Sequence, residues 1–141
     1  MIARELETII EHQISKFGIS NQPYGHIAQR FESLRAYGLL PMGRARNSQH
    51  LAHEQIASGI LSIVAASVGF AGHAALILKA LRPVGGVKAS LNQRETFGAA
   101  LEAILQNENG ALDRLIKVSV SDSEIYTNSH CRAAIHYIQE G

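Results

Sequence analysis

The feature that most limits how this chain can fold is a long run without charge in its middle. Residues 55–78, QIASGILSIVAASVGFAGHAALIL, contain no Asp, Glu, Lys or Arg. A run of this length is typical of a membrane span. Gly69 and His73 interrupt it, however, and small residues recur along it, which favours two short helices that pack closely in a core. We therefore predict core helices at about 53–67 and 70–81, and no membrane span.

The length and composition are those of one compact domain in a reducing compartment. The chain has 141 residues, of which 46% are hydrophobic and 18% are charged, so it can bury a core and is not expected to be disordered. Its only cysteine, Cys131, excludes an internal disulfide. Glu5 and Glu7 interrupt the apolar N-terminus, which argues against a signal peptide. We expect the protein to be cytoplasmic. We also expect Ile60 and Leu76 to be core positions, where substitution by alanine lowers the free energy of unfolding by about 2–5 kcal/mol.

Helical periodicity recurs on both sides of this run. Apolar residues at helical spacing predict a helix over 2–17 and another that ends at about Tyr37. Gly38 follows at the position of a left-handed cap, and Pro41 prevents the helix from resuming. A further helix is predicted within 95–115, ended by Asn109-Gly110.

The period changes from 3.6 to 2 near the C-terminus. In LIKVSVS, the apolar residues Ile116, Val118 and Val120 alternate with polar ones, which predicts a half-buried strand. HCRAAIHYI is predicted to be a second strand, joined to the first through 121–129. Its predicted inner face is made of Cys131, Ala133, Ile135 and Tyr137.

Together these elements predict an α+β fold, a mainly helical single domain with about five helices. Its N-terminal half is predicted to be winged-helix-like, and its C-terminal end to be a short two-stranded β ribbon. We place the helix-turn-helix and wing-like region at 1–54, the helical core at 55–110 and the ribbon at 111–141.

The net charge of +1 conceals a segregation of charge along the chain. Residues 1–20 sum to −1, residues 21–94 to +6 and residues 95–141 to −4. A segregated charge can create a local positive potential that attracts an anion such as a nucleic-acid backbone. The alternative is that folding interleaves the three segments and cancels their charges.

The chain contains no strong catalytic or metal-binding motif. HLAH (50–53) and HCRAAIH (130–136) each bring histidines together, but neither supplies the three or four ligands of a zinc site. RPVGGVKAS lacks the spacing of a phosphate-binding loop, and no serine lies in GxSxG. We therefore expect that the protein is not an enzyme and binds neither a metal nor a cofactor. A small hydrolase or metal protein built on the histidines is the third alternative.

Residues 26–61 resemble the front of a MerR-like winged-helix DNA-binding domain. The resemblance rests on Arg30-Phe31-Glu32, on Gly38-Leu39-Leu40-Pro41, on the arginines that follow, and on the segment from Leu51 to Gln55. The tyrosine pair and the wing Arg-Tyr of that family are missing here, as is its long C-terminal dimerisation helix. The rest of the chain is similar to small uncharacterised bacterial and prophage-associated proteins.

The resemblance implies a recognition helix that reads base edges and a basic wing that contacts phosphates. No acidic residue lies between Arg35 and His53, which fits an anion-facing surface. The predicted nucleic-acid contacts are Gln29, Arg30, Ser33, Arg35, Arg44, Arg46 and His50.

The predicted function is therefore a non-catalytic, DNA-binding transcriptional regulator of bacterial or phage type. Its predicted partners are double-stranded DNA and a second copy of the chain, bound through the C-terminal strands or the N-terminal helix. The alternative is a phage-type protein-interaction module, an inhibitor or adaptor that docks on a larger host complex, for example a defence complex, without binding DNA.

Overall fold

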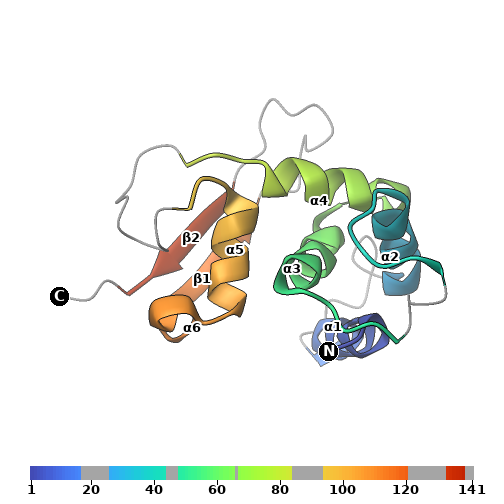
Figure 1. Ribbon diagram of the computed structural model, residues 1–141, viewed down its shortest axis with the longest axis horizontal. Helices are drawn as coiled ribbons and strands as arrows, with labels where there is room; N and C mark the ends of the chain where they lie inside the picture. The colour runs from blue at the N-terminus through green and yellow to red at the C-terminus, as the bar shows by residue number, and fades with distance from the viewer. Residues whose placement is uncertain (17–25, 44–47, 66, 84–93, 121–132, 139–141) are drawn as a thin grey trace.

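The chain folds into six α-helices and one small antiparallel sheet within the residues that the structure describes (Figure 1). The computed structural model describes residues 1–16, 26–43, 48–65, 67–83, 94–120 and 133–138. The mainly helical α+β architecture that the sequence predicts is confirmed.

The helices are short and follow one another closely. They are α1 (Ala3–Lys16), α2 (Ile27–Ala36), α3 (His53–Leu61), α4 (Ala71–Lys79), α5 (Phe97–Leu105) and α6 (Ala111–Arg114). Short 3-10 turns at Ser62–Val64 and Val68–Phe70 separate α3 from α4, and a third at Glu108–Gly110 precedes α6. The sheet consists of β1 (Leu115–Val120) and β2 (Ala133–Tyr137).

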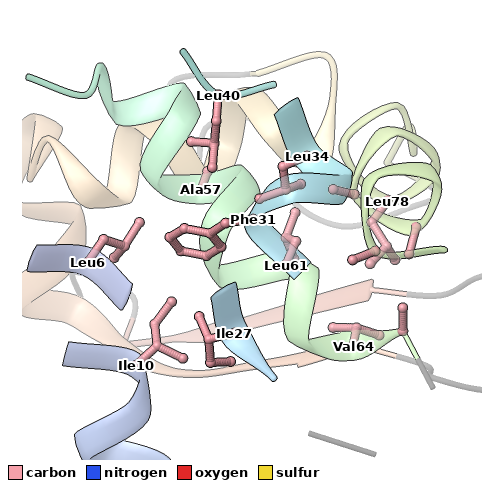
Figure 2. Packing of buried hydrophobic residues seen from close by; sticks show 14 of the residues in the cluster. Leu6, Ile10, Ile27, Phe31, Leu34, Leu40, Ala57, Leu61, Val64 and Leu78 are labelled. Atoms are coloured by element: carbon pink, nitrogen blue, oxygen red, sulfur yellow. The ribbon is translucent and has the colours of Figure 1, made fainter. Parts of the chain in front are cut away.

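The hydrophobic core lies where α1, α2, α3 and α4 meet (Figure 2). Phe31 of α2 is at its centre, between Leu6 of α1 and the apolar face of α3. α1 and α2 approach α3 closely because Gly59 has no side chain: a Cβ there would come within 2.6 Å of Leu6 Cδ2. The run at 55–78 therefore supplies two core helices, as predicted, and its small residues permit the close packing.

α4 has two apolar faces, and only one of them belongs to the core. Ala74, Ala75 and Leu78 are fully buried against α2 and α3, whereas Leu76 is 41% exposed. The expectation that Leu76 is a core position is therefore wrong, because it lies on the outer face of its helix. Ile60, the other predicted core position, is half-buried.

Leucines 76 and 78 provide a matched pair for measuring the two faces of α4. Leu78→Ala is expected to lower the free energy of unfolding by about 2–5 kcal/mol, because it leaves a cavity in the core. Leu76→Ala is expected to cost less than about 1 kcal/mol, because its side chain already contacts water. Urea denaturation of both variants measures the difference; equal costs would contradict this assignment of the faces.

No helix in the described ranges has both the length and the apolar composition that crossing a bilayer requires. α3 and α4, which share the uncharged run, have nine residues each.

Two helix ends show how the backbone turns. Gly38 adopts the predicted left-handed conformation after α2, with φ of 74°, and the N–H of Leu39 donates to the carbonyl of Leu34 (2.9 Å). The helix predicted within 95–115 is divided earlier than expected: α5 ends at Leu105, and Asn107 is already left-handed.

The C-terminal ribbon is antiparallel, as predicted, and packs its inner face on the core. Val118 pairs with Ile135 and Val120 with Ala133, and all four are half-buried against the core cluster. Ile116, however, is exposed rather than aligned with Val118, because a bulge between Leu115 and Lys117 shifts the register there. Tyr137 is half-buried as expected, and Cys131 lies outside the described residues.

Candidate functional site

Arg30, predicted to face solvent and read bases, is fully buried. Its guanidinium Nη1 donates to the carbonyl of Ser62 (2.9 Å) and to the carbonyl of Ala65 (2.6 Å). These carbonyls end the helical segment formed by α3 and the following 3-10 turn, where carbonyls have no partner within the helix. Arg30 therefore joins α2 to the end of α3, and the prediction that it faces outward is wrong.

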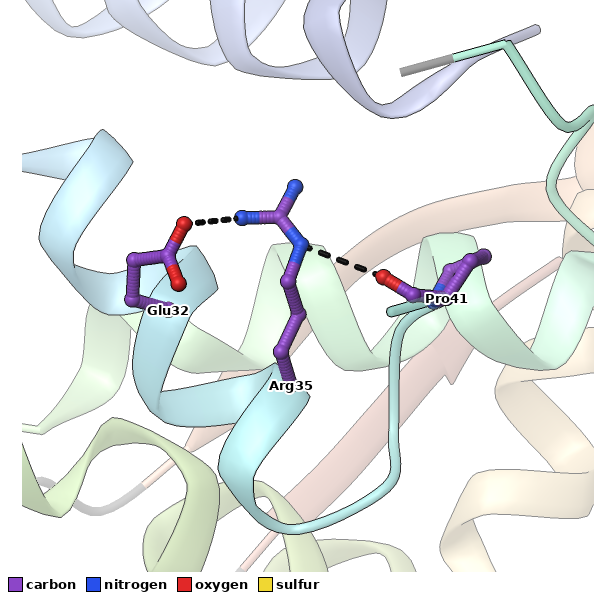
Figure 3. A network of polar contacts seen from close by, with 3 residues as sticks. All are labelled: Glu32, Arg35 and Pro41. Carbon is purple, nitrogen blue, oxygen red and sulfur yellow. Dashed lines mark hydrogen bonds and ion pairs between the residues drawn. The ribbon is translucent and has the colours of Figure 1, made fainter. Parts of the chain in front are cut away.

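Arg35 is also turned inward, with 6% of its surface exposed (Figure 3). Its Nη1 donates to Oε1 of Glu32 (2.7 Å) and its Nε to the carbonyl of Pro41 (3.2 Å). The bond to Pro41 fastens the loop after α2 to that helix, and the bond to Glu32 lies within α2 and orients the guanidinium. The predicted outward orientation of Arg35 is wrong too, because the carbonyl of Pro41 and the carboxylate of Glu32 accept hydrogen bonds from its guanidinium.

Glu7 of α1 carries a raised pKa. Partial burial raises it most, the charge of Glu11 adds to the effect, and the charges of Arg35 and Arg4 oppose it. A carboxyl with a raised pKa in the folded state contributes stability below its unfolded pKa and loses it as the pH rises.

Glu7→Gln is therefore expected to gain stability relative to wild type as the pH rises above the reference value of 4.5. The glutamine stays neutral, whereas Glu7 must ionise in a partly desolvated position. Urea denaturation at several pH values between 4 and 8 measures the difference, with Glu5→Gln at an exposed position of α1 as the control for removal of a charge. Two variants that followed the same pH profile would contradict the prediction.

The remaining predicted contacts within the described residues differ in exposure and in their bonding. Ser33 is half-buried, donates to the carbonyl of Gly69 (3.1 Å) and accepts from the N–H of Gly72 (3.0 Å). Gln29 is exposed on α2. His50 is exposed too, with Nδ1 3.1 Å from the N-terminal amine. Arg44 and Arg46 lie outside the described residues, so the predicted wing stays a prediction.

The structure instead presents an uncharged, apolar surface along the outer side of α4. Three of its residues lie on α4, one is the C-cap that follows the helix, and two lie beside it. We call these six residues the α4 strip: Tyr37, Phe70, His73, Leu76, Ile77 and Ala80. His73, Leu76, Ile77 and the C-cap Ala80 recur at i, i+3, i+4 and i+7, which places them on one face. Tyr37, Phe70, Leu76 and Ala80 are exposed, and His73 and Ile77 are half-buried.

The N-terminal end of the strip is aromatic and tightly built. The Tyr37 and His73 ring centroids are 6.4 Å apart, and those of Phe70 and His73 are 6.5 Å apart. The Tyr37 ring lies directly over Gly72, where an added Cβ would come within 2.4 Å of Tyr37 Cδ2. The two bonds of Ser33 to Gly69 and Gly72 hold α2 against the start of α4. The Tyr37 ring therefore packs directly against the backbone of α4 at Gly72.

The middle and C-terminal part of the strip form a shallow, open hollow. It has a volume of about 370 Å³ and is lined by His73, Leu76, Ile77, Ala80 and Leu81. Lys79 does not reach this surface, because its Nζ donates to Ser58 Oγ (2.9 Å) on the other side of α4. A surface of this kind suits the apolar face of another chain better than it suits a polar substrate.

Two further observations bear on chemistry. Within the described residues, no three His, Cys, Asp or Glu side chains come together to hold a metal ion. The α4 strip itself contains no acidic side chain, and its nucleophilic groups are limited to the imidazole of His73 and the phenol of Tyr37. The sequence offers one signal for this surface. The uncharged run places apolar residues on every side of α4, and a helix that buries a single face needs fewer apolar residues than this.

A comparison of the chain with protein-family models, with curated proteins and with solved structures finds no match.

Proposed function

We propose that this protein is a non-catalytic protein-interaction module that binds another polypeptide chain through the α4 strip. The observation that carries the proposal is the strip itself. Its six residues adjoin one another on the surface without an acidic or basic side chain other than His73, and the large side chains of Tyr37, Phe70 and Leu76 are exposed. Exposed aromatic and aliphatic side chains that adjoin one another are typical of protein interfaces, in which aromatic residues supply much of the binding energy. Helical spacing on one face is the arrangement that helix-mediated recognition uses.

The burial of Arg30 and Arg35 supports this function over recognition of bases by α2. Each guanidinium already donates to groups within the chain, so reaching a base edge would first require breaking those bonds. A buried charge that loses its partners costs several kcal/mol, more than a single base contact returns.

Photo-crosslinking in the cells that naturally produce the protein tests the proposal. Benzoylphenylalanine at position 76 is expected to yield a discrete crosslinked product, because Leu76 is at the centre of the strip. The matched control is position 112, where an exposed leucine lies on α6, away from the strip. Equal products at both positions, or none at position 76, would refute the function.

Duplex DNA binding in transcription regulation is a second proposal, favoured by the +6 charge of residues 21–94 and by the exposure of Gln29 and His50. Replacing Arg44 and Arg46 together by alanine is then expected to weaken binding to every duplex and to lower the salt slope by about one unit per lost phosphate contact. Titrations between low and physiological salt measure it. A wild-type protein that bound no duplex at low salt would exclude this candidate.

A further inference from the structure

We propose that the α4 strip binds a second copy of this chain, with the two α4 helices packed antiparallel across a two-fold axis. This inference rests on the proposed function and names its partner. It places the interface elsewhere than the C-terminal strands or the N-terminal helix that the sequence suggested.

The first argument is the gradient of side-chain size along the strip. Phe70 and Tyr37 stand at its N-terminal end, Leu76 and Ile77 lie in the middle, and Ala80 ends it. Phe70 and Ala80 are ten residues apart, which corresponds to roughly 15 Å along a helix. When two such strips pair antiparallel, the bulky end of each faces the small end of the other. A parallel pairing would instead place the aromatic side chains of both copies against each other.

The second argument is electrostatic. Two identical surfaces repel each other if they carry net charge, and the α4 strip carries none, since Lys79 is bonded to Ser58 on the opposite side of the helix. Antiparallel packing also places the partly positive N-terminus of each α4 beside the partly negative C-terminus of the other. A partner that binds through charged side chains would find no opposite charge on the strip.

The third argument is position. α4 packs with its inner face on α2 and α3 and runs along one edge of the molecule, and in Figure 1 none of the labelled elements lies beyond it. α1 and the ribbon lie elsewhere. The exposed apolar residues of those elements, Ile9 and Ile116, belong to separate surfaces. A self-paired α4 would form an isologous, closed dimer.

The size of the strip predicts a weak dimer. A contact roughly 15 Å long and one helix wide falls short of the ~800 Å² per partner that a standard stable interface buries. We therefore expect a reversible equilibrium, with monomers at low protein concentration and dimers at high concentration.

Sedimentation equilibrium of the full chain over a wide concentration range is the primary test. Leu76→Glu is expected to weaken dimerisation at least about tenfold, because it places an unpaired carboxylate in the apolar contact. Ile9→Glu and Leu112→Glu, at similarly exposed positions on α1 and α6, are expected to leave it within about twofold, since a surface substitution away from the contact changes little. Loss of the dimer in either control but not in Leu76→Glu would overturn the proposal.

Cysteine crosslinking tests the antiparallel arrangement in a Cys131→Ser background. Leu76→Cys is expected to crosslink to itself, because this position lies close to the two-fold axis. Phe70→Cys mixed with Ala80→Cys is expected to crosslink as a mixed pair, and Phe70→Cys alone is not. Crosslinking of Phe70→Cys with itself in preference to the mixed pair would overturn the antiparallel arrangement.

Different results would overturn self-association and the interaction function. A protein that stays monomeric at every concentration, while position 76 photo-crosslinks to a different protein, overturns self-association and leaves the interaction function standing. A monomer without any discrete product at position 76 overturns both. A photo-crosslinked product with twice the mass of the chain supports both.

Discussion

Replacing Phe31 by alanine is expected to lower the free energy of unfolding by about 3–5 kcal/mol. The Phe31 ring is fully buried at the centre of the core, where side chains from α1, α2 and α3 converge (Figure 2). It also approaches Gly59 of α3: a Cβ added to that glycine would lie 3.4 Å from Phe31 Cζ. Packing this tight cannot collapse around the missing ring, so the substitution leaves a cavity.

Phe70→Ala is the matched control, because Phe70 is the same residue type with half of its surface exposed. Its expected cost in the monomer is less than about 1 kcal/mol, since half of its surface already faces water. Urea denaturation at a low protein concentration, monitored by circular dichroism, compares the two variants. A Phe31→Ala protein as stable as Phe70→Ala would mean that the core is not centred on α2.

The fold could be predicted where periodicity and backbone chemistry act locally. The uncharged run could be recognised as two helices because Gly69 interrupts it. Gly38 could be recognised as a cap because a left-handed residue favours glycine. The alternation of Val118 and Val120 with serines defined the ribbon. Each of these features depends on neighbours within a few residues, which is the range over which sequence patterns determine structure.

The buried arginines show where this approach fails. Ile27, Arg30, Phe31 and Leu34 are spaced i, i+3, i+4 and i+7, so Arg30 occupies the same stripe as the core residues of α2. The prediction placed Arg30 on the outer face of α2 because arginine is charged, although its spacing places it among the core residues. The structure buries it because carbonyls 32 and 35 residues further along the chain accept its hydrogen bonds. Partners so distant in the sequence leave no local pattern.

The α4 strip could not be predicted for a related reason. When apolar residues surround a helix, periodicity does not tell which face is buried, and the expectation for Leu76 failed on this point. His73 was the only polar residue on this helix before Lys79. The outer face became apparent only once α2 and α3 were seen to cover Ala74, Ala75 and Leu78. Likewise, nothing in the alternating residues of β1 predicted the bulge that exposes Ile116.

Arg30→Met provides the sharpest distinction between the buried role of this arginine and the base-reading role that the sequence suggested. The variant retains most of the aliphatic stem but removes the donor that serves the carbonyls of Ser62 and Ala65. We expect it to lower the free energy of unfolding by about 3–5 kcal/mol, because buried carbonyls lose a charged donor and α2 loses its attachment to the end of α3. Gln29→Met, the neighbouring change at an exposed position, is expected to stay within about 0.5 kcal/mol of wild type.

Arg30→Lys separates charge from geometry at the same position. Lysine keeps the positive charge, but its shorter side chain and compact ammonium do not reproduce the planar guanidinium whose Nη1 donates to both carbonyls. Its expected stability therefore lies between those of wild type and Arg30→Met. Urea denaturation of the three variants gives the order of stability. A fully stable Arg30→Met that bound duplex DNA with reduced sequence discrimination would restore the base-reading role. Strong destabilisation, with Gln29→Met unaffected, would instead establish Arg30 as the residue that fastens α2 to the end of α3.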